Sequence, residues 1–302
     1  MIYVAQLLNG LEYGVLLFLM AAGLTLVFGI MSFVNLAHGS LYMVGAYVAA
    51  AVSNASGSFL FGLGSALVAS IALGVVLERV AISRLYSRDH LDHVLATFGL
   101  ILFFNEVIVM IWGKQPLFSS VPSWLSGHLQ FGDFTYPIYR IAIIVTGLLV
   151  ALGSYLLIHR TRLGMLIRAG ATNAPMVAAL GVNIGLLNAL LFVIGATLAG
   201  LAGAVAGPIL SVQAGMGEPV LITTLVVIVI GGIGSVRGAF YSALIVGVVD
   251  TMGRAFLPVL LRQFTTASLA DAAGPAVASL LIYLLMAAVL AWRPQGLFAQ
   301  HA

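Results

Sequence analysis

Ionisable side chains stand inside two of the long apolar runs of this sequence, where a charged group is costly and is therefore a candidate for function. Asp250 and Arg254 are four residues apart, so on a helix they share one face and can form an ion pair. Such a pair either makes insertion of its helix tolerable or lines a pathway. Glu106, preceded by Asn105, either faces a water-filled cavity or bonds a neighbouring helix. Movement of a solute or of protons is the chemistry that these groups could support.

A polar interruption, Phe33-Val-Asn-Leu-Ala-His-Gly39, separates the first two apolar runs. It is either a plain cytoplasmic turn or a break in a helix whose freed backbone lines a cavity. In the second case Asn35 and His38 face that cavity, and they join Glu106 as candidates for a substrate pathway.

The elements that position these residues must be membrane helices. The 302 residues are 62% hydrophobic and only 7% charged, whereas a soluble domain carries about 25% charged residues. This composition excludes a soluble enzyme, and a net charge of +3 is too small for a nucleic-acid-binding surface. Because the chain has no cysteine, disulfides and iron–sulfur clusters are excluded as well.

Apolar runs of roughly 20 residues predict helical spans rather than barrel strands. We expect an all-α, polytopic membrane bundle that forms one transmembrane domain over residues 1–302. About nine helices are expected, with a range of eight to ten. The first residues, Met1–Gly10, lack the basic stretch of a cleavable signal peptide. The expected spans are Glu12–Phe33, His38–Asn54, Phe59–Glu78, Val94–Trp112, Pro137–Ile158, Leu186–Gly207, Pro219–Ser235, Gly238–Leu257 and Asp271–Trp292.

The distribution of basic residues predicts the orientation, because short cytoplasmic loops are enriched in Lys and Arg. Most of the 12 basic residues fall on one side of the expected spans. These are Arg79, Arg84, Arg88, Arg160, Arg162, Arg168, Arg237 and Arg293. That side is therefore expected to be cytoplasmic, with the N-terminus outside and the C-terminus in the cytoplasm.

Small residues recur at every fourth position in two of the expected helices, which lets helix backbones approach closely in lipid. The two stripes are Gly62, Ala66, Ser70, Gly74 and Gly195, Ala199, Gly203, Gly207. We expect them to pack helices tightly; movement of helices over the same surface is the alternative.

Motifs for catalysis and for cofactors are missing. A phosphate-binding loop needs Gly-Lys-Ser/Thr, but the single lysine, Lys114, is followed by Gln115. The run Asp89-His90-Leu91-Asp92-His93 could ligate a metal, but we favour a solvated cytoplasmic turn whose charges cancel those of nearby arginines. We therefore expect no enzyme activity, no cofactor and no metal in this chain.

A short helix is predicted inside the arginine-containing segment His159–Gly185. Asn173 is a suitable N-cap, proline is tolerated in a first helical turn, and Gly181 suits the position just after a helix. The helix either lies on anionic lipid through its arginines or docks onto a cytoplasmic partner.

Six stretches resemble, in the same order, the LivH-type permease subunit of bacterial branched-chain amino-acid ABC importers. They are GLTLVFGIMSFVNLAHGSLYMVGAY (Gly23–Tyr47), ATFGLILFFNE (Ala96–Glu106), TRLGMLIRAGATNAPMVAALGVN (Thr161–Asn183), FVIGATLAGLAGAVAGP (Phe192–Pro208), VIVIGGIGSVRGAF (Val227–Phe240) and RPQGLF (Arg293–Phe298). The resemblance implies a permease in the bacterial cytoplasmic (inner) membrane. It also implies as partners a second related permease, two cytoplasmic ATPases and an extracytoplasmic substrate-binding protein that contacts outer loops, chiefly Lys114–Tyr136.

The resemblance further implies that residues 159–185 form the coupling loop, with the helix Pro175–Leu180 seated in a cleft of the ATPase. The coupling candidates are Arg162, Gly164, Arg168, Ala169, Ala178 and Gly181. Val177 stands before Ala178-Ala179 where other importers carry the glutamate of a Glu-Ala-Ala motif. Docking is therefore expected to depend on Arg162, on Arg168 and on shape.

The sequence thus predicts an ATP-driven importer permease for branched-chain or related amino acids that works by alternating access. A permease for urea or short amides is the alternative within the family. An ion-coupled secondary transporter would use Glu106 and Asp250 as proton or sodium sites, and an intramembrane enzyme would use Asp250 or His38.

Overall fold

A computed structural model describes residues 2–31, 34–86, 88–131 and 134–298. Each of the nine predicted spans coincides with a helix. The helices are α1 (Ile2–Met31), α2 (His38–Ser56), α3 (Phe59–Leu77), α5 (His90–Trp112), α6 (Ile138–Arg160), α8 (Ile184–Ala206), α9 (Gly217–Gly231), α10 (Val236–Leu261) and α11 (Ala267–Trp292). The first helix begins ten residues before the predicted Glu12, and the predicted end at Phe33 lies outside the described residues.

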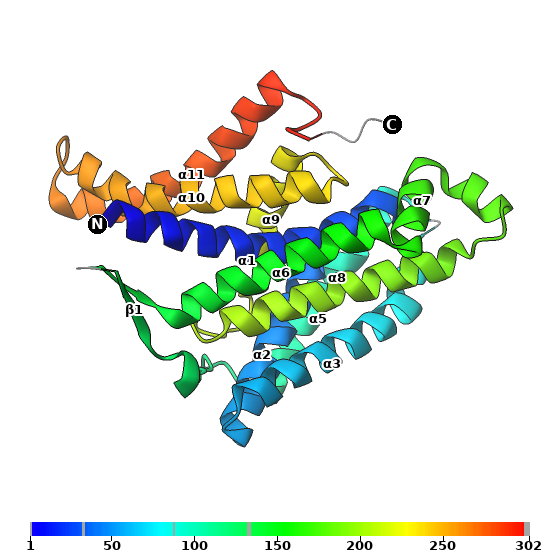
Figure 1. The fold of residues 1–302 in the computed structure, drawn as a ribbon, viewed down its shortest axis with the longest axis horizontal. Coiled ribbons are helices and arrows are strands. Elements are labelled where there is room, and N and C mark those ends of the chain that lie inside the picture. Colours follow the sequence, from blue (N-terminus) through cyan, green and yellow to red (C-terminus); the bar gives the residue numbers. More distant parts are fainter. Residues whose placement is uncertain (1, 32–33, 87, 132–133, 299–302) are drawn as a thin grey trace.

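Seven of these helices are long and apolar enough to cross a membrane. The exceptions are α2 and α9, the latter with 15 residues, and the number of spans therefore stays a prediction. Figure 1 shows α1, α6, α8 and α10 running between the end that holds the N-terminus and the end that holds α7 (Arg162–Ala179). The central helix is α1, which packs along α10, α8 and α6.

Glycine contacts bring the central helices together. A Cβ on Gly247 of α10 would lie 2.4 Å from Gly14 N and 2.5 Å from Gly10 O, both backbone atoms of α1. The predicted stripe on α3 is confirmed, because Gly62, Ala66, Ser70 and Gly74 are buried. On the second stripe, Gly203 packs directly against the backbone of Tyr42 in α2. At these crossings the helices therefore pack through direct backbone contact at small residues rather than through interlocking side chains.

Both α2 and α9 begin inside the bundle rather than at its edge. Asn35 and His38 are 0% and 1% exposed, and the His38 ring lies beside Gly23 in the last third of α1. The first turn of α2 crosses that of α9 at Gly39 and Gly217, where neither glycine has room for a Cβ. The chain therefore returns into the bundle after α1. This geometry supports a helix break, not an exposed cytoplasmic turn.

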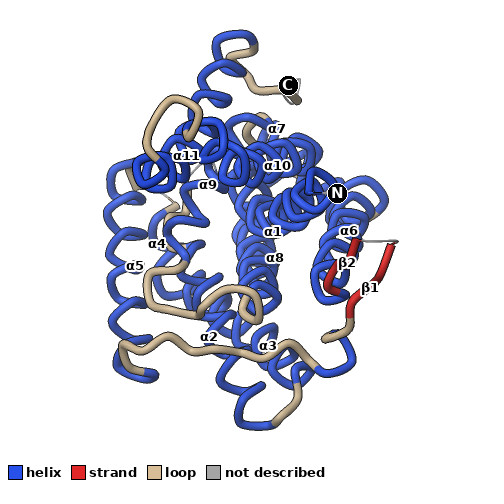
Figure 2. Tube along the Cα trace, turned by 90° about the vertical axis from the view of Figure 1, so that its left-hand side faces the viewer, coloured by secondary structure: helices blue, strands red, loops and turns tan. Residues whose placement is uncertain are grey.

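The predicted outer segment between α5 and α6 departs from a purely helical fold. It contains the 3₁₀ turn η2 (Ser123–Leu125) and an antiparallel hairpin of β1 (His128–Phe131) and β2 (Phe134–Pro137), with His128 opposite Pro137. Figure 2 shows the hairpin beside α6. Leu117 and Val212 form an isolated antiparallel bridge that joins this segment to the loop before α9. At the opposite end, the π-helical turn η1 (Glu78–Ile82) and α4 (Ser83–Leu85) extend α3.

Candidate coupling and pathway sites

The predicted coupling segment starts with a tight return of the chain from α6 into α7. The Thr161 side chain caps α7 by accepting a hydrogen bond from Gly164 N at 3.0 Å. Gly164 is buried, and a Cβ there would clash with the carbonyl oxygens of Leu157 and Ile158. Glycine at this position therefore allows the two helices to meet at a sharp angle.

A kink at Asn173 divides α7 into two helices. Asn173 has φ −155° and ψ 86°, and its Oδ1 accepts a hydrogen bond from Met176 N at 3.0 Å. Pro175 follows in the first turn, and Gly181 ends the helix with φ +88°. The predicted short helix with its Asn173 cap is confirmed. The helical stretch that precedes it, residues 162–172, was not predicted.

The two halves of α7 differ in how the bundle holds them. Ile167 of the first half is 7% exposed and packs in a cluster with Leu26, Leu187 and Leu191. We call residues 173–181 the tip; its buried residue is Val177, at 6% exposed. The remaining tip residues are exposed or half-buried, so the tip projects from the bundle.

Two large apolar side chains of the tip lie open. Met176 is 62% exposed and Leu180 is 76% exposed, and their i, i+4 spacing places them on one face. They were not among the predicted coupling residues, although two apolar residues four apart between a cap and a helix-ending glycine were a usable signal in the sequence. An exposed apolar pair on one helix face is suited to a groove in another protein.

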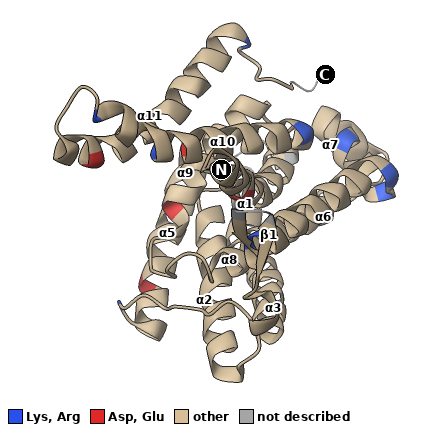
Figure 3. Cartoon of the chain, turned by 60° about the vertical axis from the view of Figure 1, so that its left-hand side comes forward, with Lys and Arg blue, Asp and Glu red and all other residues tan. Residues whose placement is uncertain are grey.

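Most of the predicted coupling residues are open to solvent, but the side chain of Arg168 is held against α6. Arg162, Ala169, Ala178 and Gly181 are exposed, and basic side chains gather at the α6–α7 end of the molecule (Figure 3). Arg168 is also exposed, but its guanidinium turns back and donates a hydrogen bond to the carbonyl oxygen of Ile158. That bond ties α7 to the end of α6.

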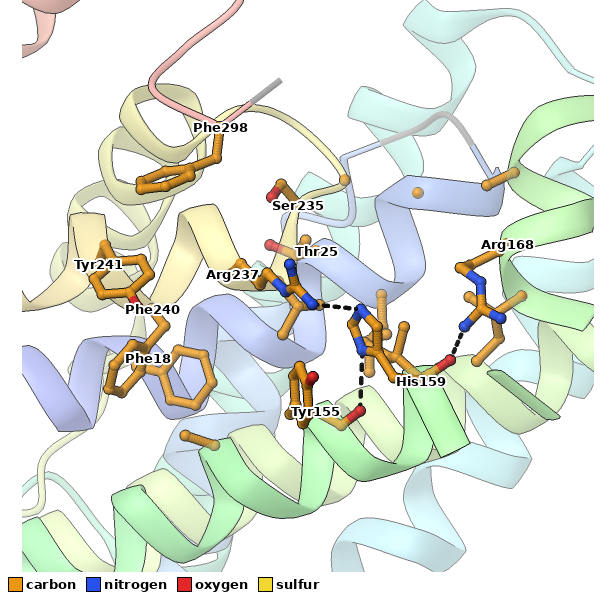
Figure 4. A pocket seen from close by; sticks show the side chains of 18 residues that line it. Phe18, Thr25, Tyr155, His159, Arg168, Ser235, Arg237, Phe240, Tyr241 and Phe298 are labelled. Carbon is orange, nitrogen blue, oxygen red and sulfur yellow. Dashed lines mark hydrogen bonds between the residues drawn. The ribbon is translucent and has the colours of Figure 1, made fainter. Parts of the chain in front are cut away.

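A cavity of about 700 Å³ adjoins this bond, lined by α1, α6, α7, α10 and the C-terminal segment. Figure 4 shows Arg237 at its centre, where Arg237 Nη2 donates to His159 Nε2 at 3.1 Å. The guanidinium carbon of Arg237 also lies 5.3 Å from the centroid of the Tyr155 ring, which is a cation–π contact. The sequence drew attention to Arg237 only as a marker of orientation.

The three pathway candidates differ in their burial. Asn35 and His38 are buried where α2 begins, whereas Glu106 is exposed on the outer surface of α5. Its neighbour Asn105 points inward instead: Asn105 Nδ2 donates to Glu218 Oε1 at 2.6 Å.

The Asn105 side chain also links the start of α9 to α5, since its Oδ1 accepts from Gly215 N at 3.2 Å. Gly215 N lies 3.3 Å from Met43 Sδ of α2. A polar network beside the broken helices is thus built from Asn105 and Glu218. Sequence reasoning missed Glu218 because it sits at the boundary of an apolar run.

Asp250 and Arg254 form an ion pair, with 2.8 Å between Asp250 Oδ2 and Arg254 Nε. The Asp250 side chain is 7% exposed and that of Arg254 is 50% exposed. Arg254 Nη2 also donates to Ser279 Oγ at 3.1 Å, which joins α10 to α11. The charge of the buried aspartate is therefore balanced by Arg254, which in turn ties α10 to α11.

A second buried carboxylate, Glu12, is paired in the first half of α1. Arg140 Nη1 lies 3.0 Å from Glu12 Oε2 and donates to Asn9 Oδ1 at 2.8 Å. Tyr136 OH also donates to Asn9 Oδ1. Burial, with Glu12 nearby, raises the pKa of Tyr136 to about 12, so the hydroxyl stays a hydrogen-bond donor at neutral pH.

The described ranges contain no cluster of three or more His, Asp and Glu side chains that could hold a metal ion. In the Asp89–His93 run, His93 Nε2 lies 2.6 Å from the carbonyl oxygen of Leu85, which ties the start of α5 to α4.

Residues 6–290 match the family described as branched-chain amino acid transport system, permease component. The high-affinity branched-chain amino acid transport system permease protein BraD of Pseudomonas aeruginosa is 30% identical over 317 residues, covering 99% of this chain and 96% of that protein. LivH of Escherichia coli, with the same description, is 30% identical over 276 residues, or 84% and 87% of the two chains. PsaBC from Streptococcus pneumoniae in complex with Fab has a TM-score of 0.47 at 11% identity, over 92% of this chain and 89% of that one.

Proposed function

The chain belongs to the family of permease components of branched-chain amino acid transport systems, and we propose that it is the membrane-spanning subunit of an ATP-driven importer of branched-chain or related amino acids. It is an integral protein of the bacterial cytoplasmic membrane. The observation that carries this function is the family match over residues 6–290, with BraD aligned along almost its whole length.

The tip is proposed as the part that receives the motion of a cytoplasmic ATPase. Its exposed Met176 and Leu180 would enter an apolar cleft on that partner, while Arg162 and the small residues Ala169 and Ala178 border the contact. The first half of α7 transmits the motion, because Ile167 is packed into the bundle. Arg168 acts as a positioning residue that fixes α7 to α6 through the Ile158 carbonyl.

The substrate pathway is proposed to pass the point where α2 and α9 begin. Helix starts inside a membrane protein present unpaired backbone N–H groups and a positive dipole end, which suit the carboxylate of an amino acid. Asn35 and His38 stand at this point, and Gly39 and Gly217 bring the two helix starts together. Glu106, exposed on α5, would face a second permease subunit. Asp250–Arg254 is assigned a structural role.

The full transporter is proposed to contain this chain, a second related permease, two cytoplasmic ATPases and an extracytoplasmic binding protein. ATP hydrolysis belongs to the ATPase subunits. The outer segment 114–136, with its η2 turn and hairpin, offers the binding protein a folded surface at the end opposite to the tip.

Purification of the tagged chain from gently solubilised native membranes tests this composition. We expect two ATPases with Walker motifs and a second permease to co-purify with it. Recovery of a stable, monodisperse chain without them would contradict the proposal.

Uptake by the recovered assembly in liposomes, loaded inside with ATP and supplied outside with binding protein, tests the substrate. Labelled leucine is expected to accumulate only with ATP, and labelled urea to remain outside. Accumulation of urea instead would favour the alternative within the family. Leucine uptake by the chain alone, driven by an ion gradient, would favour a secondary transporter.

A further inference from the structure

The cavity beside α7 opens to the surface of the bundle between two helices. Phe18, Thr25 and Gly29 of α1 form its inner wall. Tyr155 of α6 and Tyr241 of α10 flank it and are 42% and 51% exposed, so it opens to the surface between these two helices. Its far end is closed by Ile167 and other residues of α7.

One end of the cavity is basic. Arg168 and Arg237 both line it, together with His159, and the lining includes no Asp or Glu. Over the part of the chain that the structure describes, neither arginine forms a salt bridge with a carboxylate. Arg237 is instead held by uncharged groups, the His159 ring nitrogen and the face of Tyr155. Its positive charge is therefore available to an anion.

Two further groups at the same end lack a complete set of hydrogen-bond partners. The N-terminus of α10 lies on the wall, with Ser235 as its cap accepting a bond from Gly238 N at 3.1 Å, and helix N-termini favour anions. Thr25 Oγ1 is buried and has no hydrogen-bond partner among the described residues. Other helix threonines, such as Thr197 and Thr224, bond the carbonyl four residues earlier. Thr25 thus has an unused hydroxyl on the cavity wall.

The other end of the cavity is aromatic. Phe18 and Phe240 meet edge to face with 5.1 Å between ring centroids, and Tyr241 stacks on Phe298 at 5.2 Å. Figure 4 shows these four rings on the side of the cavity away from Arg168 and His159. A basic end and an apolar end within one cavity match an amphiphile better than a small ion.

We propose that this cavity binds the phosphate-bearing head group of an anionic phospholipid at the cytoplasmic surface of the membrane. Arg237 and Arg168 contact the phosphate, the α10 N-terminus and Thr25 supply hydrogen bonds, and the acyl chains lie against the aromatic end. Basic pockets between helices on the cytoplasmic side bind such head groups in general. Free phosphate shares the anionic chemistry but leaves the aromatic end unexplained.

Native mass spectrometry of the intact assembly tests the site, with added phosphatidylglycerol, phosphatidylcholine or inorganic phosphate. We expect one tightly retained phosphatidylglycerol and no retained phosphatidylcholine. Arg237→Gln is expected to weaken retention about tenfold, the effect of losing one charge-assisted hydrogen bond. Gly29→Leu should displace the lipid without changing the charge, because a Cβ on Gly29 has ordinary 3.7 Å contacts and the longer side chain would fill the cavity. Arg160→Gln, an exposed arginine outside the cavity, is the matched control and should change nothing.

Equal retention of phosphatidylglycerol by Arg237→Gln, Gly29→Leu and the native chain would overturn the site. Equal retention of phosphatidylcholine would overturn the role of the basic end. Displacement of phosphatidylglycerol by millimolar phosphate would make the free ion the ligand and overturn the lipid source. If Arg237→Gln does not yield a monodisperse assembly, Gly29→Leu decides the question alone.

Discussion

The crossing of α1 with α10 and the tip of α7 are both built from small and apolar residues, yet the chain buries one and leaves the other open. At the crossing, Gly10 and Gly14 meet Gly247 with no room for a side chain. At the tip, Met176 and Leu180 are 62% and 76% exposed. Composition alone therefore does not separate a helix contact from a docking surface; the difference lies in whether the chain supplies the opposite face.

The difference also divides the molecule into a part that holds its shape and a part that transmits motion. Because the two backbones already touch at these glycines, the crossing has no space for a larger side chain. The tip, held by Val177 and by the Asn173 kink, needs a partner to cover its apolar pair. Substitutions should accordingly affect stability at the crossing and transport at the tip.

The largest effect on stability is expected from Gly247→Ala. The new Cβ would come within about 2.5 Å of Gly14 N and Gly10 O, so the backbones must separate. Overpacking of this kind costs about 3 kcal/mol. The expected result is a strongly lowered melting temperature and a smaller monodisperse peak on size exclusion.

Gly153→Ala is the matched control for that substitution. Gly153 is exposed in the interior of α6, and nothing lies within 4 Å of its added Cβ. Alanine there should leave stability unchanged or raise it by about 1 kcal/mol, because glycine is a poor helix former. Equal destabilisation by both alanines would contradict the role assigned to close packing.

Leu180→Asp should abolish transport while leaving the bundle folded. A carboxylate on the apolar face of the tip cannot enter an apolar cleft without a large desolvation cost. ATP-driven leucine uptake is expected to fall at least about tenfold, a typical loss for a central contact residue. The melting temperature of the assembly should stay within a few degrees of the native value.

Thr172→Asp introduces the same charge beside the tip instead of on its apolar face. Thr172 is exposed and lies just before the kink. Uptake by this variant is expected to stay within about twofold of the native value, as for most surface changes. A loss equal to that of Leu180→Asp would mean that charge near the tip, not its apolar pair, matters for coupling.

A smaller effect is expected from Gly181→Ala. Gly181 has φ +88°, and an L-residue in a left-handed conformation costs about 1–2 kcal/mol. The end of the tip should fray, which lowers uptake severalfold with the ATPase still bound. Hydrogen exchange at residues 178–182 should speed up, and unchanged exchange would show that the glycine is not needed to end the helix.

The smallest effect is expected from Asp271→Asn. Arg262 and Asp271 form a salt bridge of 2.8 Å, but their side chains are 53% and 51% exposed. An exposed pair contributes below about 1 kcal/mol. Neither stability nor uptake should change measurably, so this variant sets the baseline for the others.

Local signals allowed the sequence to predict much of this fold. The stripe on α3, the Asn173 cap and the Gly181 helix end depend on residues close in sequence, and the structure contains all three. Each predicted span also coincides with a helix.

Contacts between residues far apart in the sequence could not be predicted from these local signals. The direction in which Arg168 turns depends on the carbonyl of Ile158 at the end of another helix. Likewise, Asn105 faces Glu218 while its neighbour Glu106 faces outward, which only the packing of α5 on the loop before α9 decides. The roles of Asn35, His38 and Glu106 in a pathway stay predictions.

Site-directed cross-linking at the tip tests the central claim most directly. The chain has no cysteine, so Leu180→Cys provides a unique thiol for a maleimide photocross-linker in native membranes. Phe118→Cys, 73% exposed in the outer segment, is the control. The tip thiol is expected to cross-link to a cytoplasmic ATPase, with a yield that changes when ATP is added, and the control thiol is not. Cross-links from Leu180→Cys to lipid alone, or no more ATPase than the control captures, would contradict the coupling role of the tip.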